Sequence, residues 1–266
     1  MINAAVLGSP IAHSLSPRLH TAAYRYLKID GSYSSFDVPA GTLKNFLSDK
    51  SDSWTGFSLT MPLKEEALTC VDVIDPLVQR IKSGNTLVKE EDVWKLFTTD
   101  VLGFKNAWRI HNKEKPISVV IIGSGATARA AAAAFDSSGT KICIIHRNSE
   151  REDSMKNCVQ ESSIDFYPWI FKDFILEADL VINTTPKFAL DDFSKNVASK
   201  PSGTFFDVIY DPWPTQFAQA WKGQGGRVIG GIELLIAQGV EQIKLFSKLP
   251  IPTDDLIKFL GRELAI

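Results

Sequence analysis

A β-branched run that ends in closely spaced glycines limits the possible folds of this sequence more than any other feature. Residues 117–122 are apolar almost without interruption, which is typical of a parallel strand buried on both faces. Six residues with the pattern G-x-G-x-x-A come next, and an alanine-rich run to residue 134 then favours a helix. This order of strand, glycine turn and helix predicts an α/β fold with a doubly wound parallel sheet.

The glycine turn also predicts a ligand. In a dinucleotide-binding turn the first glycine permits the sharp bend, and the second lets the backbone approach a pyrophosphate. A small third residue lets the helix pack close to the strand. A tight turn without a ligand can have the same spacing, but a strand before it and a helix after it favour the binding role. We therefore predict that a dinucleotide contacts these six residues: Gly123, Ser124, Gly125, Ala126, Thr127 and Ala128.

The next strand, predicted over residues 141–145, is followed by residues that favour NADP over NAD. NAD-binding folds place an acidic residue at this strand end to hold the ribose hydroxyls. This chain has Arg147 and Arg151 instead, and a guanidinium can offer paired donors to the oxygens of a 2′-phosphate. Glu150 lies between the two arginines and keeps NAD open as the alternative.

Composition excludes several classes of function. The chain has 266 residues, 44% of them hydrophobic, which is enough for two α/β units. Its 29 basic and 31 acidic residues leave a net charge of −2, so neither nucleic acid nor a membrane surface is expected as a partner. The first residues lack the charged region of a signal peptide, and no apolar stretch reaches the roughly 18 residues of a membrane span. We expect a cytoplasmic protein.

Neither disulfides nor a metal site is expected. The three cysteines are an odd number without C-x-x-C spacing, which argues against a disulfide framework and a zinc site. The four histidines show no ligand spacing either.

Strand-like runs alternate with helical patterns along the rest of the chain. In the first part we predict strands over residues 4–7, 32–38 and 54–59, a hairpin over residues 85–88 and 93–97, and a helix from Pro17 with Ser16 as its N-cap. In the second part we predict strands over residues 180–183, 204–208 and 227–229, and helices over residues 231–246 and 254–264. This alternation predicts parallel sheets joined by crossover helices.

Six further segments carry a resemblance to a known family. They are GSPIAHSLSP (8–17), GFSLTMPLK (56–64), SGNT (83–86), TDVLG (99–103), DVIYDP (207–212) and GIELLIAQ (231–238). Together with the glycine turn, they resemble the shikimate dehydrogenase family in order and spacing, over essentially the whole chain. The resemblance implies an α/β substrate domain at residues 1–101 and a Rossmann-type NADP-binding domain at residues 102–237. It also implies that the C-terminal helices, residues 238–266, pack back onto the first domain.

Lys64 and Asp100 are the candidate catalytic residues. Reduction of a ketone by hydride requires a proton for the developing alkoxide, and a positioned ammonium supplies both that proton and a stabilising charge. A neighbouring carboxylate orients the lysine. The resemblance places such a pair at these two positions, beside the nicotinamide. Without it, the two residues would be interpreted as a surface lysine and a helix N-cap.

A set of small polar residues is the candidate substrate site. Shikimate carries one carboxylate and several hydroxyls, so its site needs neutral donors and acceptors. Ser14 and Ser16 offer two hydroxyls just after a strand, at the sheet edge where ligands of open α/β sheets bind. The resemblance implies that both serines hold the carboxylate. It implies further polar contacts with the substrate from Thr60, Asn85, Tyr210 and Gln238, and a cofactor site that includes Asn183, Thr184 and Gly231.

The implied reaction is reversible hydride transfer between NADPH and 3-dehydroshikimate, which gives shikimate. It belongs to the pathway to chorismate and the aromatic amino acids, and would take place between the two domains of a monomer or a homodimer. The chain departs from the family pattern just before Asp100, where Leu96 and Thr98 replace a usual glycine and asparagine. The loop that aims Asp100 is therefore expected to differ from that of the family.

Two other functions stay open. A dehydrogenase that uses NAD with quinate or shikimate shares nearly all of the substrate motifs, but Arg147 and the missing acidic residue disfavour it. A non-catalytic sensor of NADP or a shikimate-like metabolite is disfavoured because Lys64 and Asp100 are both present, whereas the altered approach to Asp100 favours it. A folate-type dehydrogenase lacks support, because the serine pair would have no use there.

Overall fold

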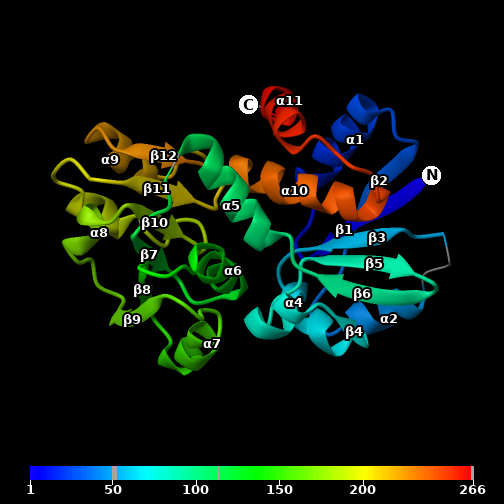
Figure 1. Cartoon of the computed structure of the whole chain (residues 1–266), viewed down its shortest axis with the longest axis horizontal. Coiled ribbons are helices and arrows are strands. Elements are labelled where there is room, and N and C mark those ends of the chain that lie inside the picture. The colour runs from blue at the N-terminus through cyan, green and yellow to red at the C-terminus, as the bar shows by residue number, and fades with distance from the viewer. Residues whose placement is uncertain (50–52, 113, 265–266) are drawn as a thin grey trace. The chain divides into compact units, whose positions relative to one another are not determined.

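The computed structural model of the chain describes residues 1–49, 53–112 and 114–264 (Figure 1). The chain forms two units: unit 1 consists of Met1–Gly103 and Leu235–Ile266, and unit 2 of Phe104–Leu234. The sequence places these divisions at 101/102 and 237/238. Among the described helices, none is long and apolar enough to cross a membrane.

Unit 1 is built on a six-stranded sheet with the order β2-β1-β3-β5-β6-β4. Its strands are β1 (Ile2–Gly8), β2 (Gly31–Asp37), β3 (Gly56–Leu59), β4 (Val73–Ile74), β5 (Thr86–Glu90) and β6 (Val93–Phe97). β1 is parallel to β2 and β3, and β4 is parallel to β6, whereas β5 is antiparallel to both β3 and β6. The predicted hairpin is thus confirmed.

The turn between β5 and β6 explains why the sheet of unit 1 is mixed rather than wholly parallel. Glu91 and Asp92 form this two-residue turn, and both have positive φ, 49° and 65°. Such a turn matches the twist of two antiparallel strands, so the chain doubles back without a crossover helix.

Helices cover both faces of this sheet. α1 (Ser16–Leu27), α11 (Thr253–Leu264) and the end of α10 (Gly231–Ser247) lie on one side, and α2 (Leu43–Ser48) and α4 (Pro76–Ile81) on the other (Figure 1). α3 (Leu63–Glu66) follows β3. α5 (Asp100–His111) begins in unit 1, whose first segment ends at Gly103, and continues into unit 2.

The start of α1 corrects one prediction. The N-cap is Leu15, and Ser16 is already the first helical residue, so Ser16 does not cap the helix. The hydroxyl Oγ of Ser14 accepts the backbone N–H of Ser16 at 3.3 Å and takes that role instead. Pro17 is the second helical residue, where an N–H would also lack a partner within the helix.

The face under α2 and α4 holds an apolar core. Fully buried side chains come from four neighbouring strands of the sheet: Leu7, Phe57, Leu87 and Leu96. Leu43 of α2 and Val78 of α4 pack against them. This layer fixes the sheet whose strand ends carry the candidate catalytic residues.

The opposite face contains a buried histidine. His20 of α1 is completely buried, and its ring stacks on that of Tyr33 with centroids 3.8 Å apart and an interplanar angle of 9°. Neither ring nitrogen of His20 has a hydrogen-bond partner. Gln242 lies nearby and raises the pKa of the ring, but by less than burial lowers it. Burial therefore lowers the pKa of His20 from 6.5 to about 3.

This lowered pKa predicts a loss of stability in acid. Below pH 6.5 the unfolded chain protonates His20 and the folded chain does not, so the free energy of unfolding falls as the pH drops from 6.5 towards 3. At pH 5 the loss is about 2 kcal/mol, since each pH unit contributes about 1.4 kcal/mol. Urea unfolding at pH 7.5 and pH 5 should show this loss in the wild type but not in His20→Phe, which keeps a ring against Tyr33. Replacement of the exposed His13 by alanine is the control, and equal pH dependence of wild type and His20→Phe would contradict the prediction.

Unit 2 contains a wholly parallel six-stranded sheet with the order β12-β11-β10-β7-β8-β9. Its strands are β7 (Ser118–Ile122), β8 (Lys141–His146), β9 (Ser163–Pro168), β10 (Leu180–Asn183), β11 (Thr204–Asp207) and β12 (Arg227–Ile229). The chain passes from β7 outward to β9 and then returns to place β10 against the other side of β7. The predicted doubly wound sheet is confirmed, and its order reverses between β7 and β10, where ligands of such folds bind.

The helices of unit 2 are mostly short. α6 (Ala126–Phe135) follows β7, and α7 (Glu152–Lys156), α8 (Phe174–Glu177) and α9 (Gln216–Gly223) follow later strands. In α6 the alanines from Ala130 to Ala132 are fully buried, because their small side chains let the helix lie close to the sheet.

Candidate active site

One edge of the sheet of unit 1 collects the candidate catalytic residues. β1 and β3 are parallel neighbours, so their carboxyl ends lie side by side. β5 runs the opposite way and therefore begins at this edge, while β6 runs back and ends there. Thr60 and Lys64 follow β3, Asn85 precedes β5, and Thr99 and Asp100 follow β6. Three strands, β3, β5 and β6, thus bring residues from distant parts of the sequence to one place.

Lys64 and Asp100 form an ion pair at this edge. The ammonium Nζ of Lys64 lies 2.6 Å from the carboxylate Oδ2 of Asp100, and the side chains are 17% and 5% exposed. The backbone carbonyl of Lys64 accepts the N–H of Gly84 at 2.9 Å, which ties α3 to the segment before β5. A cation held this way, mostly buried but open on one side, can pass a proton to a bound molecule.

Asn85 fixes the other oxygen of Asp100. Its amide Nδ2 donates to Oδ1 of Asp100 at 2.9 Å, and its Oδ1 accepts the backbone N–H of Thr99 at 2.7 Å. The unusual residues Leu96 and Thr98 therefore leave Asp100 directed at Lys64, because Asn85 holds the backbone immediately before it.

Gln238 of α10 completes this group. Its Oε1 accepts Nδ2 of Asn85 at 3.1 Å and the hydroxyl of Thr99 at 3.4 Å, while its Nε2 donates to the carbonyl of Leu235 at 2.9 Å. Gly103 makes the approach of α10 possible, since a Cβ there would lie only 2.7 Å from Cβ of Gln238.

The remaining predicted substrate residues lie at two places. Ser14 and Ser16 follow β1, and Thr60 follows β3, so all three lie near the same edge of unit 1. The methyl group of Thr60 packs closely on Gly8. A Cβ added to Gly8 would lie 2.4 Å from this methyl carbon. Tyr210 belongs to unit 2, and burial raises the pKa of its phenol.

The glycine turn of unit 2 has the geometry of a phosphate cradle. Gly123 has φ +113°, and a Cβ on it would lie 2.4 Å from the hydroxyl of Thr184, so only glycine fits. Gly125 is the N-cap of α6, and the nearest atom to a Cβ placed on it is Nη1 of Arg151 at 3.6 Å. The turn is therefore open above Gly125, with backbone N–H groups of a helix start and a guanidinium around the opening.

The two arginines after β8 are exposed side chains with different surroundings. The guanidinium carbon of Arg147 lies 4.1 Å from the ring centroid of Trp169, a cation–π contact that limits its freedom. Arg151 lies over the glycine turn, as described above. Glu150 is exposed, and its N–H donates to the side chain of Asn148 at 2.9 Å.

Asn183 and Thr184 support the turn through their side chains. Nδ2 of Asn183 donates to the carboxylate of Asp207 at 2.9 Å, and the hydroxyl of Thr184 donates to the carbonyl of Ile122 at 2.9 Å. Burial raises the pKa of Asp207. Gly231 packs against the backbone of Val208. A Cβ added to Gly231 would lie 2.3 Å from the carbonyl oxygen of Val208.

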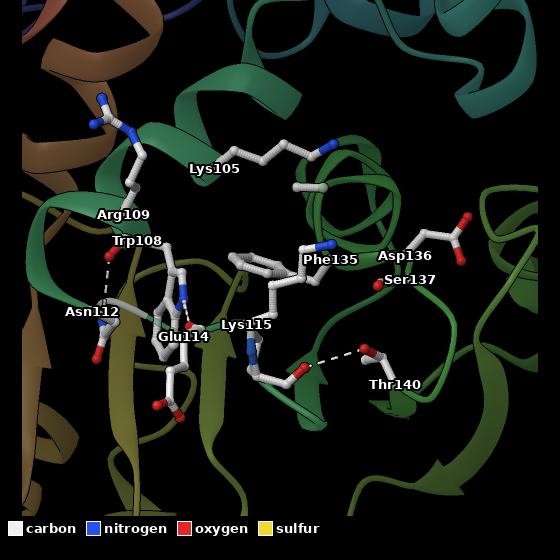
Figure 2. Close-up of a pocket in the computed structure, with 12 residues that line it drawn as sticks. Lys105, Trp108, Arg109, Asn112, Glu114, Lys115, Phe135, Asp136, Ser137 and Thr140 are labelled. Carbon is white, nitrogen blue, oxygen red and sulfur yellow. Dashed lines mark hydrogen bonds between the residues drawn. The ribbon is translucent and has the colours of Figure 1, made fainter.

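A separate hollow in unit 2 lies at the wrong edge of the sheet to hold the cofactor (Figure 2). Its volume is about 280 Å³, and Trp108 and Phe135 form its apolar wall. Pro116 and Thr140, which line it, precede β7 and β8, whereas the glycine turn follows β7. Ligands of open parallel sheets bind at the carboxyl ends of the strands, so this hollow is not part of the candidate site.

A doubly wound sheet with a dinucleotide turn, together with a lysine–carboxylate pair at a second sheet edge, defines a dinucleotide-dependent oxidoreductase of two α/β units. Comparison with known proteins identifies the family within this class. The family described as shikimate dehydrogenase substrate binding domain matches residues 6–87. A shikimate dehydrogenase (NADP(+)) of Ignicoccus hospitalis is 31% identical, over 91% of this chain and 92% of that protein.

Solved structures agree with this match. Shikimate dehydrogenase from Mycobacterium tuberculosis superposes with a TM-score of 0.85 at 31% identity, covering 98% of this chain and 99% of that one. The enzyme from Thermus thermophilus, solved in complex with NADP(H) and shikimate, gives a TM-score of 0.82 at 30% identity, covering 99% and 100%. The chain belongs to the shikimate dehydrogenase family.

Proposed function

We propose that this protein is an NADP-dependent shikimate dehydrogenase, which reduces 3-dehydroshikimate to shikimate reversibly and uses Lys64 and Asp100 for proton transfer. The observation that carries the proposal is the 2.6 Å ion pair between these side chains at the carboxyl edge of the sheet, in a chain of this family. In the pathway to chorismate and the aromatic amino acids, this reaction interconverts a ring ketone and a ring alcohol.

The proton is the part of the reaction that unit 1 supplies. NADPH, when bound, supplies the hydride for the carbonyl carbon. The ammonium of Lys64 then donates a proton to the alkoxide oxygen that forms, so that one hydride and one proton convert the ketone to the alcohol. Asp100 holds the ammonium in place through Oδ2, and the side-chain amide Nδ2 of Asn85, which donates to Oδ1, keeps the carboxylate from turning away.

Polar groups of the same edge suit the rest of the substrate. We assign the carboxylate of shikimate to the hydroxyls of Ser14 and Ser16, since a hydroxyl can donate to an anion without adding charge. Thr60, Asn85 and Gln238 are assigned to the ring hydroxyls or the carboxylate, together with Tyr210 from unit 2, as the family implies.

The residues of unit 2 fit NADP. The helix start at Gly125 and the open turn suit a pyrophosphate, and Arg151 lies above this opening. We assign the 2′-phosphate to the guanidinium groups of Arg147 and Arg151, because paired N–H donors match phosphate oxygens. Asn183 and Thr184 would act mainly by shaping the turn. We further propose that the enzyme works in the cytoplasm, as a monomer or a homodimer, on small molecules alone.

The test is absorbance at the nicotinamide band with shikimate or quinate, each paired with NADP or NAD. Fast cofactor reduction with shikimate and NADP, and at least about tenfold slower reduction with the other pairs, is the expected result. Activity mainly with quinate and NAD would show that Arg147 does not select the cofactor. No reduction in any of the four mixtures, from protein that binds NADP, would favour a sensor over an enzyme.

A further inference from the structure

A second glutamine of α10 lies one turn beyond Gln238. Gln242 is spaced four residues from Gln238, so both side chains project from the same face of the helix. Gln242 is 2% exposed, and its amide makes three hydrogen bonds. Nε2 donates to the backbone carbonyl of Asn85 and to the hydroxyl Oγ1 of Thr86, both at 3.1 Å, and Oε1 accepts the hydroxyl of Ser58 at 2.8 Å.

The direction of these bonds can be determined from the groups involved. A backbone carbonyl only accepts, so the amide nitrogen of Gln242 must face Asn85, and the same N–H₂ group must donate to Thr86. With its oxygen occupied as an acceptor in this way, the hydroxyl of Thr86 directs its own proton to Oδ1 of Asn85, 2.9 Å away. The hydroxyl of Tyr33 in turn donates to Ser58 at 2.6 Å, which leaves Ser58 to donate to Gln242.

The orientation of Asn85 follows from this chain of donors. Its Oδ1 receives protons from Thr86 and from the backbone of Thr99, so its Nδ2 has to point the other way, towards Asp100. A reversed amide would turn Nδ2 towards the N–H of Thr99 and present an oxygen to the carboxylate of Asp100. Both contacts are repulsive in a buried site, where a wrongly paired polar group is costly.

We propose that Gln242 is a positioning residue for catalysis: acting through Thr86, it fixes the amide of Asn85 so that an N–H donor always faces the carboxylate that holds Lys64. This inference deepens the proposed function and rests on it for the role of Lys64. It does not place Gln242 in contact with the substrate, since Asn85 and Thr86 lie between Gln242 and the ion pair.

Three variants test this chain of hydrogen bonds. Gln242→Met keeps the length of the side chain but removes the amide, and Thr86→Val keeps the shape of Thr86 but removes the hydroxyl. Each is expected to lower kcat for shikimate oxidation by about tenfold, the usual effect of one misdirected buried hydrogen bond, with KM for shikimate changed less than about twofold. Thr86→Ser keeps the hydroxyl and is expected to retain most of the wild-type kcat. Gln219→Met, in α9 of unit 2, is the matched control.

The double variant separates a shared chain from two independent defects. If Gln242 and Thr86 act through the same amide, Gln242→Met with Thr86→Val should lower kcat no further than either change alone. Two independent packing defects would instead multiply, to about a hundredfold loss. Multiplied losses, or a Thr86→Ser variant as slow as Thr86→Val, would overturn the proposal.

A measurement without turnover keeps this inference distinct from the proposed function. Hydrogen exchange of the Asn85 side-chain amide, followed by nuclear magnetic resonance, should be slow in the wild type and at least about tenfold faster in Gln242→Met. Equal exchange in both proteins would overturn the positioning role, whether or not the wild type oxidises shikimate. Faster exchange in a protein that does not act on shikimate would uphold the positioning of Asn85 and reject the proposed function instead.

Discussion

Replacement of Lys64 by alanine is expected to lower kcat for shikimate oxidation by about a thousandfold or more. The variant loses the proton carrier and the charge that stabilises the alkoxide, two effects that together lie within the range of general acid–base catalysis. Asp100 would also lose the cation with which it is paired. The dissociation constant for NADP should stay near that of the wild type, because the predicted cofactor residues belong to unit 2. Stopped-flow absorbance and fluorescence titration measure the two quantities.

Lys64→Arg distinguishes the proton from the charge. A guanidinium keeps the positive charge but does not release a proton in the working pH range of enzymes. If proton transfer is the main role, kcat of this variant should be nearly as low as that of Lys64→Ala. Lys258→Ala, an exposed position on α11, is the control and should turn over at the wild-type rate. Turnover of Lys64→Ala within about threefold of the wild type would remove Lys64 from the mechanism.

Replacement of Arg147 by glutamine is expected to raise KM for NADP by about 30- to 100-fold while KM for NAD changes little. The variant loses the charge-assisted hydrogen bonds to the 2′-phosphate, a group that NADP carries and NAD lacks. Steady-state kinetics with both cofactors at saturating shikimate measure the effect. Arg227→Gln, an exposed arginine of β12, serves as the control.

Trp169 refines this prediction. Its ring lies against the guanidinium of Arg147, so Trp169→Leu should raise KM for NADP by only about threefold, since an exposed cation–π contact is worth less than the phosphate bonds. An equal loss with NADP and NAD in Arg147→Gln would assign Arg147 to structure rather than to cofactor choice.

The sequence predicts best those strands that are buried on both faces. β7, β10 and β11 lie within one residue of their predicted ends, because uninterrupted apolar runs leave little choice of conformation. β9 is harder to predict from SIDFYP, since it is an edge strand whose buried and exposed positions mix and whose last residue is a proline. β4 has only two residues, too few for any pattern.

The candidate site shows the same division between local and distant information. Lys64 and Asp100 are predicted only through the resemblance, because nothing in the residues around them indicates that these two side chains, 36 positions apart, are in contact. Ser58 and Gln242 are 184 positions apart, and the sequence predicts neither to be functional. The available signal is the pair of glutamines spaced four residues apart on the mostly apolar helix α10. The prediction of Ser16 as the N-cap is wrong because it relied on local rules alone. These rules favour a serine before a proline as the cap, whereas in the structure Ser14 supplies the capping contact.

The way the chain divides between the two units has a consequence for synthesis. Unit 2 is one continuous stretch, so every contact within it can form once residue 234 has left the ribosome. Unit 1 combines a segment before unit 2 with a segment after it, and until α10 is made, Asn85 and Thr99 lack the amides of Gln238 and Gln242. A nascent chain would therefore hold a finished nucleotide unit beside an unfinished catalytic edge. The proton-transfer residues would become fully held only after α10 has been made.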